Sequence, residues 1–96
     1  MGTNVGAVAV TAAGAIIASP AVLAGVVFRN SHATNAGVFR IYDNTSAATG
    51  TVLFVASLAA GAHVHHTYPG LGVQASKGLF LEITGSATVE GSVQIA

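Results

Sequence analysis

Three histidines lie close together in this sequence, at His63, His65 and His66. In an extended strand alternate side chains share a face, so His63 and His65 should point to one side and His66 to the other. Two imidazoles at this spacing can chelate a metal ion, but a useful site needs a third or fourth ligand, and His32 is distant in sequence. We therefore expect no metal site, with His63 and His65 as the nearest candidates. Hydrogen bonding on a polar strand face is the expected role, and a pH-sensitive contact is an alternative because imidazole titrates near neutrality.

Few other groups could support catalysis. Paired carboxylates would have to come from Asp43, Glu82 and Glu90, and both glutamates fall on strand faces that we expect to point outward. Nucleophilic catalysis needs a positioned nucleophile, base and orienting group, and the serines and histidines form no recognisable motif of this kind. The sequence therefore predicts a protein that is not an enzyme and that uses no cofactor.

Charged residues are scarce throughout the chain. Only 6% of the 96 residues are Asp, Glu, Lys or Arg, against about 25% in an ordinary soluble domain. The formal net charge is zero, which removes the usual electrostatic protection against association. Three scattered basic residues cannot neutralise a phosphate backbone, so nucleic acid is not an expected partner. Much of the surface is instead expected either to be polar but uncharged, or to be covered by copies of the chain or by a larger assembly.

The first 28 residues carry no charged side chain. A membrane span is not expected there, because polar residues and glycines interrupt the segment and Pro20 sits within it. Residues 1–20 are expected either to form the first strands of the domain or to act as an arm that pairs with a neighbouring chain. The arm is favoured, since an apolar alternating segment makes a poor free tail. The predicted interface residues are Val5, Val8, Val10, Ile16, Val22 and Leu23.

Apolar and polar residues alternate along the chain, with turn signals about every ten residues, which is typical of an all-β sandwich or barrel. The length suits a single domain, residues 1–96. We expect about eight antiparallel strands in a jelly-roll-like β-sandwich. In the range 21–30, strict alternation places Val22, Val26 and Phe28 on one face and Leu23 and Val27 on the other. The expected strand ranges are 5–11, 21–30, 37–43, 51–58, 62–68, 79–84 and 88–95, and 15–18 and 72–75 are candidates for short strands.

The two ends of the chain differ in the polarity of their strands. The last two expected strands have one polar face, marked by Glu82 and Glu90, as a solvated antiparallel sheet should. The first strands have no such face, so part of their surface is expected to meet another chain. The N-terminal part is therefore the predicted contact region, and the C-terminal hairpin is predicted to face water.

Residues 21–96 carry an ordered set of strand and turn elements. They are IYDNTS at 41–46, GTVL at 50–53, YPG at 68–70, and GLFL at 78–81 leading to Thr84-Gly85. In these elements the chain resembles a family of small β-sandwich decoration, or cement, proteins of tailed bacteriophage particles. The elements are turn and strand patterns rather than catalytic motifs, and residues 1–20 and the histidine run lie outside the resemblance.

This resemblance implies a non-enzymatic structural protein of the virion, located on the phage capsid surface. Such a protein would bridge neighbouring subunits of the major capsid protein, with a homotrimer favoured, and its binding to the assembled shell would stabilise that shell. No nucleic acid or membrane partner is expected. The alternative is a phage tail or fibre domain that binds a host glycan or receptor.

Overall fold

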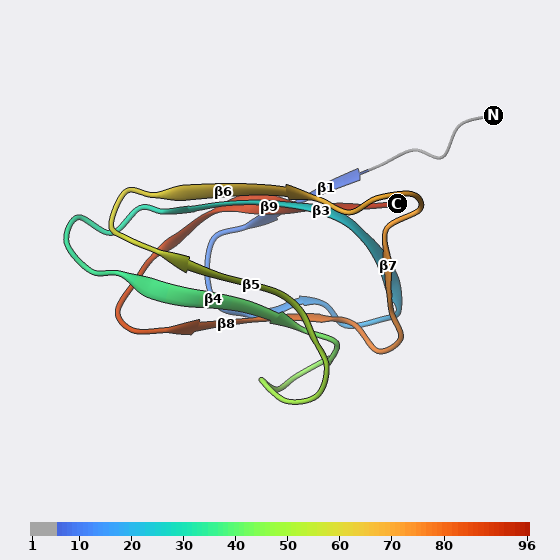
Figure 1. Cartoon of the computed structure of the whole chain (residues 1–96). Coiled ribbons are helices and arrows are strands. Elements are labelled where there is room, and N and C mark those ends of the chain that lie inside the picture. The colour runs from blue at the N-terminus through green and yellow to red at the C-terminus, as the bar shows by residue number, and fades with distance from the viewer. Residues whose placement is uncertain (1–5) are drawn as a thin grey trace.

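The chain folds into two antiparallel β-sheets packed face to face (Figure 1). The computed structural model describes residues 6–96. None of these residues forms a helix long and apolar enough to cross a membrane. The expected all-β sandwich is confirmed, with nine strands where about eight were expected. The strands are β1 (Gly6–Val10), β2 (Gly14–Ile17), β3 (Ala21–Asn30), β4 (Gly37–Tyr42), β5 (Val52–Leu58), β6 (His63–Thr67), β7 (Val73–Ala75), β8 (Leu79–Thr84) and β9 (Val89–Ile95).

The strands pair as one long hairpin folded over on itself. β4 pairs with β5, β3 with β6 and β7, β2 with β8, and β1 with β9, always antiparallel. One sheet, here called sheet A, has the order β1-β9-β3-β6 with β7 also beside β3, and the other, sheet B, has the order β2-β8-β4-β5. Two sheets built from such nested pairs form a jelly roll, so the expected jelly-roll-like topology is confirmed.

The described part of the N-terminal segment belongs to the domain itself. β1 occupies one edge of sheet A beside β9, and β2 occupies one edge of sheet B beside β8. Of the two alternatives, these residues form the first strands rather than an arm, because β9 and β8 each offer an open edge for pairing. The charge-free stretch is divided between both sheets, with β1 and most of β3 in sheet A and β2 in sheet B.

The core lies between the two sheets and is built from aromatic and aliphatic side chains of both. Phe28 on β3 packs against Phe39 on β4 and Phe54 on β5, with ring centroids 6.1 and 5.8 Å apart. The contact with Phe54 is edge-to-face, which is a favoured geometry for aromatic pairs. Leu23, Val26, Ile41, Leu79, Leu81 and Val93 complete the fully buried set.

A β-bulge in β3 changes which side chains enter this core. Leu23 pairs with Ile95 and Gly25 with Gln94, so β3 advances two residues where β9 advances one. Leu23 therefore points into the core together with Val26 and Phe28, whereas Val22 is half-buried. The strict alternation predicted for residues 21–30 is wrong at this point, because a one-residue slip moves side chains to the opposite face.

Two of the predicted interface residues belong to the core. Val10 is 3% exposed and Leu23 has no exposed surface. The interface prediction is wrong for these two, because a side chain buried within its own chain cannot contact a neighbour. Val8 and Ile16 are half-buried and pack against the core from β1 and β2.

Candidate functional site

Small and polar side chains cover the outer face of sheet A, the side that points away from sheet B. Strand pairing aligns them in rows, and an open hollow of about 400 Å³ is lined by Ala24, Gly25, Val27, His65, Thr67 and Gln94. The face is therefore low in relief and offers mainly neutral hydrogen-bonding groups. The rows across β6, β3 and β9 are His63–Arg29–Glu90, His65–Val27–Ser92 and Thr67–Gly25–Gln94, and β1 adds Ala9 and Ala7 to the second and third.

The outer face of sheet B carries larger apolar groups. Val55 and Val52 on the edge strand β5 are 57% and 43% exposed. Beside Val52 lie Tyr42 and Phe80, both half-buried, so an apolar strip runs across this sheet. The rows across β8, β4 and β5 are Thr84–Val38–Ser57, Glu82–Arg40–Val55 and Phe80–Tyr42–Val52.

Each outer face has an ion pair between neighbouring strands. On sheet A, Arg29 Nη1 lies 3.4 Å from Glu90 Oε1, and the two side chains are 51% and 67% exposed. On sheet B, Arg40 Nη1 lies 3.7 Å from Glu82 Oε1, with both side chains about one-third exposed. The Tyr42 hydroxyl also donates to Glu82 Oε1 at 3.2 Å. Burial, with a contribution from Glu82, raises the pKa of this hydroxyl.

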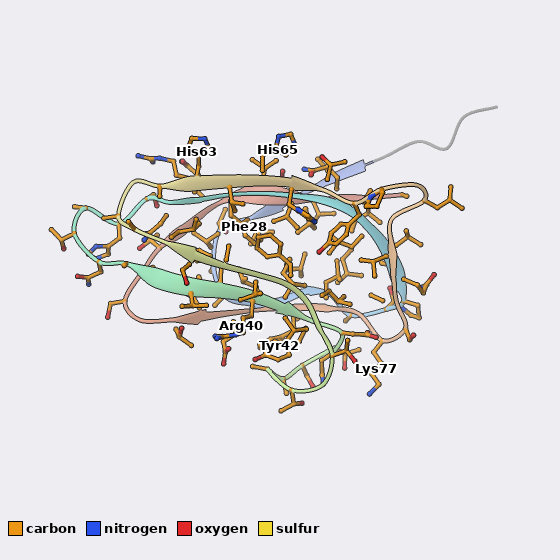
Figure 2. All side chains as sticks on the ribbon, in the orientation of Figure 1. Phe28, Arg40, Tyr42, His63, His65 and Lys77 are labelled. Atoms are coloured by element: carbon orange, nitrogen blue, oxygen red, sulfur yellow. The ribbon has the colours of Figure 1, made fainter. Side chains whose placement is uncertain are left out.

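The structure confirms that His63 and His65 share one face and that His66 points to the other. Figure 2 shows His63 and His65 directed away from the sandwich, above sheet A. His66 instead packs edge-to-face on Tyr68, with ring centroids 4.6 Å apart, and lies 6.2 Å from Phe54. Among residues 6–96, no group of three or more His, Cys, Asp or Glu side chains is arranged to hold a metal ion.

His66 and Tyr68 line an apolar cleft at the side of the sandwich where β5 and β6 face each other. The cleft has a volume of about 290 Å³, and residues 52–55 and Val64 complete its lining. The Tyr68 hydroxyl donates to the backbone carbonyl of Leu53, which connects the two sheets across this opening. Burial raises the pKa of Tyr68. The ring of Tyr68 closes one end of the cleft, and its hydroxyl is already occupied by the hydrogen bond to Leu53.

Sequence reasoning missed a buried polar anchor at one end of the sandwich. Asn30 is fully buried, and its side-chain nitrogen donates to the carbonyls of Asn35 and Leu58 at 2.7 and 3.1 Å. Its side-chain oxygen accepts from the amides of His32 and Thr88 at 3.1 and 3.3 Å. No local signal distinguishes Asn30 from the other polar residues of the 30–35 segment, because two partners come from distant strands and turns.

Asp43 also has a structural role that the sequence did not reveal. Its carboxylate accepts hydrogen bonds from the backbone amides of Ser76, Lys77 and Gly78 at 3.0, 2.8 and 3.3 Å. These bonds, that from Lys77 above all, lower the pKa of Asp43 below its ordinary value of 3.8. Asp43 therefore ties the end of β4 to the turn that precedes β8, and its oxygens are engaged there.

The remaining predicted interface residues lie on strands near the edges of the sandwich. Val8 and Ile16 lie on the two edge strands β1 and β2, and Val22 lies on β3 where β7 pairs with it. Val5 lies outside the described residues. Contact of Val8, Ile16 and Val22 with another chain stays a prediction.

Comparisons of the chain with protein-family models, with curated proteins and with solved structures find no match.

Proposed function

We propose that the chain is a non-enzymatic structural protein of a tailed-bacteriophage particle, which oligomerises and decorates the capsid. The observation that carries this proposal is the scarcity of charge on a surface of ordinary size. The folded chain exposes 4978 Å², close to the roughly 5000 Å² expected for a monomer of this mass. Only three basic and three acidic residues are available to charge that surface.

Most of these charges already have partners within the chain. Arg29 and Arg40 each pair with a glutamate on a neighbouring strand, and Asp43 is engaged by three backbone amides. The uncharged remainder of the surface can be buried without the cost of desolvating unpaired charges. This property favours a protein whose surface is covered by other subunits in the assembled particle.

The outer face of sheet B is the proposed contact with the major capsid protein. Val52 and Val55 are the most exposed large apolar residues on any described strand, and both lie on the edge strand β5. Burying them removes apolar surface from water, which favours association. Self-association, with a homotrimer favoured, is assigned to the edge strands that carry Val8 and Ile16.

The test combines native mass measurement with capsid binding. The wild-type chain should form a defined oligomer and co-sediment with empty capsids of a candidate host phage. Val55→Asp should abolish co-sedimentation, whereas Val27→Asp, on the exposed outer face of sheet A, is the matched control and should leave it intact. A monomer that ignores capsids would contradict the proposal, and equal behaviour of the two variants would contradict the assignment to sheet B.

A phage tail or fibre domain that binds a host glycan or receptor is the second candidate. The observation that favours it is the adjacency of Tyr42 and Phe80 on sheet B, beside Arg40 and Glu82. Aromatic surface flanked by polar groups is a common way to orient a small ligand. This candidate predicts sugar binding by a monomer and its loss in Tyr42→Ala, with no affinity for capsids.

A further inference from the structure

His63 and His65 differ from the other two histidines in how the fold uses them. His32 Nδ1 accepts hydrogen bonds from the amides of Thr34 and Asn35 at 3.1 and 3.0 Å. His66 is exposed but packs edge-to-face on Tyr68. His63 and His65 are also exposed, and within residues 6–96 no hydrogen bond or aromatic contact involves either ring. Their imidazole nitrogens are therefore free to bind a ligand.

The positions of these two rings suit a shared ion. Both project from the same face of β6 and in the same direction (Figure 2). A strand rises about 3.4 Å per residue, so their Cα atoms should lie about 7 Å apart. Two imidazoles so placed can lean together until each has a nitrogen about 2.1 Å from one metal ion.

The neighbours on sheet A leave this position open. Val27, opposite His65, is apolar and offers no competing group. Arg29 is opposite His63, but its guanidinium pairs with Glu90 on β9, the strand on the far side of β3 from β6. Its positive charge is thus partly compensated and directed away from the histidines. Because β6 is the outermost strand of the sheet A path, water can reach an ion held there.

We propose that His63 and His65 form a binding site for a divalent first-row transition-metal ion. Imidazole nitrogens suit Zn²⁺, Ni²⁺ and Cu²⁺, and Cu²⁺ should bind more tightly than Zn²⁺ by the general order of metal affinities. Water fills the remaining coordination positions, as in open metal sites. The missing third protein ligand, which argued against a metal site from the sequence, makes the site open rather than absent. This inference does not depend on the proposed capsid role.

The test is a calorimetric titration of untagged protein with ZnCl₂. The wild-type chain should show one site, and His63→Ala and His65→Ala should each weaken Zn²⁺ binding by at least about tenfold. His66→Ala is the matched control, on the same strand but the opposite face, and should leave the Zn²⁺ affinity unchanged. Both metal-site residues are exposed, so the variants should retain the circular dichroism spectrum and melting temperature of the wild type.

A second readout identifies the ligands directly. Substoichiometric Cu²⁺ should broaden the ring resonances of His63 and His65 in NMR spectra before those of His32 and His66. The proposal is overturned if the wild-type chain binds no Zn²⁺, if the double variant His63→Ala/His65→Ala keeps wild-type affinity, or if His66→Ala loses as much. Preferential broadening of His32 or His66 would also overturn it.

Discussion

Sheet A and sheet B each carry an ion pair on the outer face, and the two pairs differ in how much water reaches them. Arg29 and Glu90 on sheet A are mostly exposed, whereas Arg40 and Glu82 on sheet B are two-thirds covered. Glu82 also accepts a hydrogen bond from the Tyr42 hydroxyl. Exposed pairs contribute little to stability. On sheet B the charges help to hold β4 and β8 together, whereas the exposed pair on sheet A contributes little to the pairing of β3 with β9.

The surroundings of the two pairs differ in the same direction. Sheet A surrounds its pair with small residues, glycine and two uncommitted histidines, while sheet B surrounds its pair with aromatic and branched apolar side chains. A charge-poor protein thus separates two surface chemistries onto opposite faces. The outer face of sheet A is mainly small and polar, and that of sheet B is mainly apolar.

The largest effect should come from Gly91→Ala, in the centre of sheet A. Gly91 has a φ of +155°, and a Cβ there would lie 1.9 Å from the carbonyl oxygen of Val27. We expect a loss of more than about 3 kcal/mol in the free energy of unfolding, measured by urea denaturation. Gly6→Ala, at the edge of the same sheet, is the control, because its added Cβ meets nothing within 4 Å. Equal effects would show that sheet A does not depend on this close backbone approach.

Asn30→Ala and Asn44→Ala compare the asparagine that ends β3 in sheet A with one in the loop that follows β4 in sheet B. Asn44 also makes four side-chain hydrogen bonds, accepting from Ser46 and Ala47 and donating twice to Thr49. Asn30 is fully buried and Asn44 is not. Because buried partners left unsatisfied are costly, we expect losses of about 3 kcal/mol for Asn30→Ala and about 1 kcal/mol for Asn44→Ala by urea denaturation. The reverse order would contradict the role assigned to burial.

Glu82→Gln and Glu90→Gln test the two ion pairs directly. Glu82→Gln should lower the free energy of unfolding by about 1 kcal/mol, because the ion pair with Arg40 is lost and the Tyr42 hydroxyl keeps only a neutral acceptor on the more covered face. Glu90→Gln should change it by less than about 0.5 kcal/mol. Urea denaturation at low and high salt checks both values, since salt screens the exposed pair more strongly. Equal changes in the free energy of unfolding for the two variants would contradict the proposed difference between the ion pairs of the two sheets.

The last comparison is Asp43→Asn, at the junction of the sheets, whose effect should depend on pH. The pKa of Asp43 is lower in the folded than in the unfolded chain, so its contribution to stability is present above pH 3.8 and is lost as the pH falls through the depressed folded value. The wild type should melt at a higher temperature than the variant at pH 7, and the two should converge in acid. A difference that persists unchanged to the acid end would contradict this linkage.

The sequence predicted the fold class and much of the strand pattern because period-two alternation is a local property. On β4 and β8, for example, Arg40 and Glu82 point outward and Ile41 and Leu81 inward, as alternation requires. The bulge at Leu23–Gly25 was not predictable in this way, since it depends on how β3 pairs with β9. That single shift placed Leu23 in the core rather than at an interface.

The candidate site was predicted in part. The shared face of His63 and His65 follows from spacing alone. The availability of the two rings for a ligand does not follow from spacing, because it depends on Arg29 being paired with Glu90, sixty-one residues away. The buried anchor Asn30 was missed for the same reason, since its partners Leu58 and Thr88 are remote in sequence. Local patterns predict elements, whereas register between distant strands decides which side chains remain available.

The nested pairing of the strands also has a consequence for the order of folding. Among the described strands, only β4 and β5 are both consecutive and paired, so a nucleus built on neighbouring strands would start there. Each further pair closes a longer loop, ending with β1 on β9, and such non-local topologies fold in milliseconds to seconds rather than microseconds. During synthesis β1 and β2 cannot pair until β9 and β8 have been synthesised. In that interval the apolar N-terminal strands are exposed, and pairing between nascent chains competes with correct closure of the sandwich.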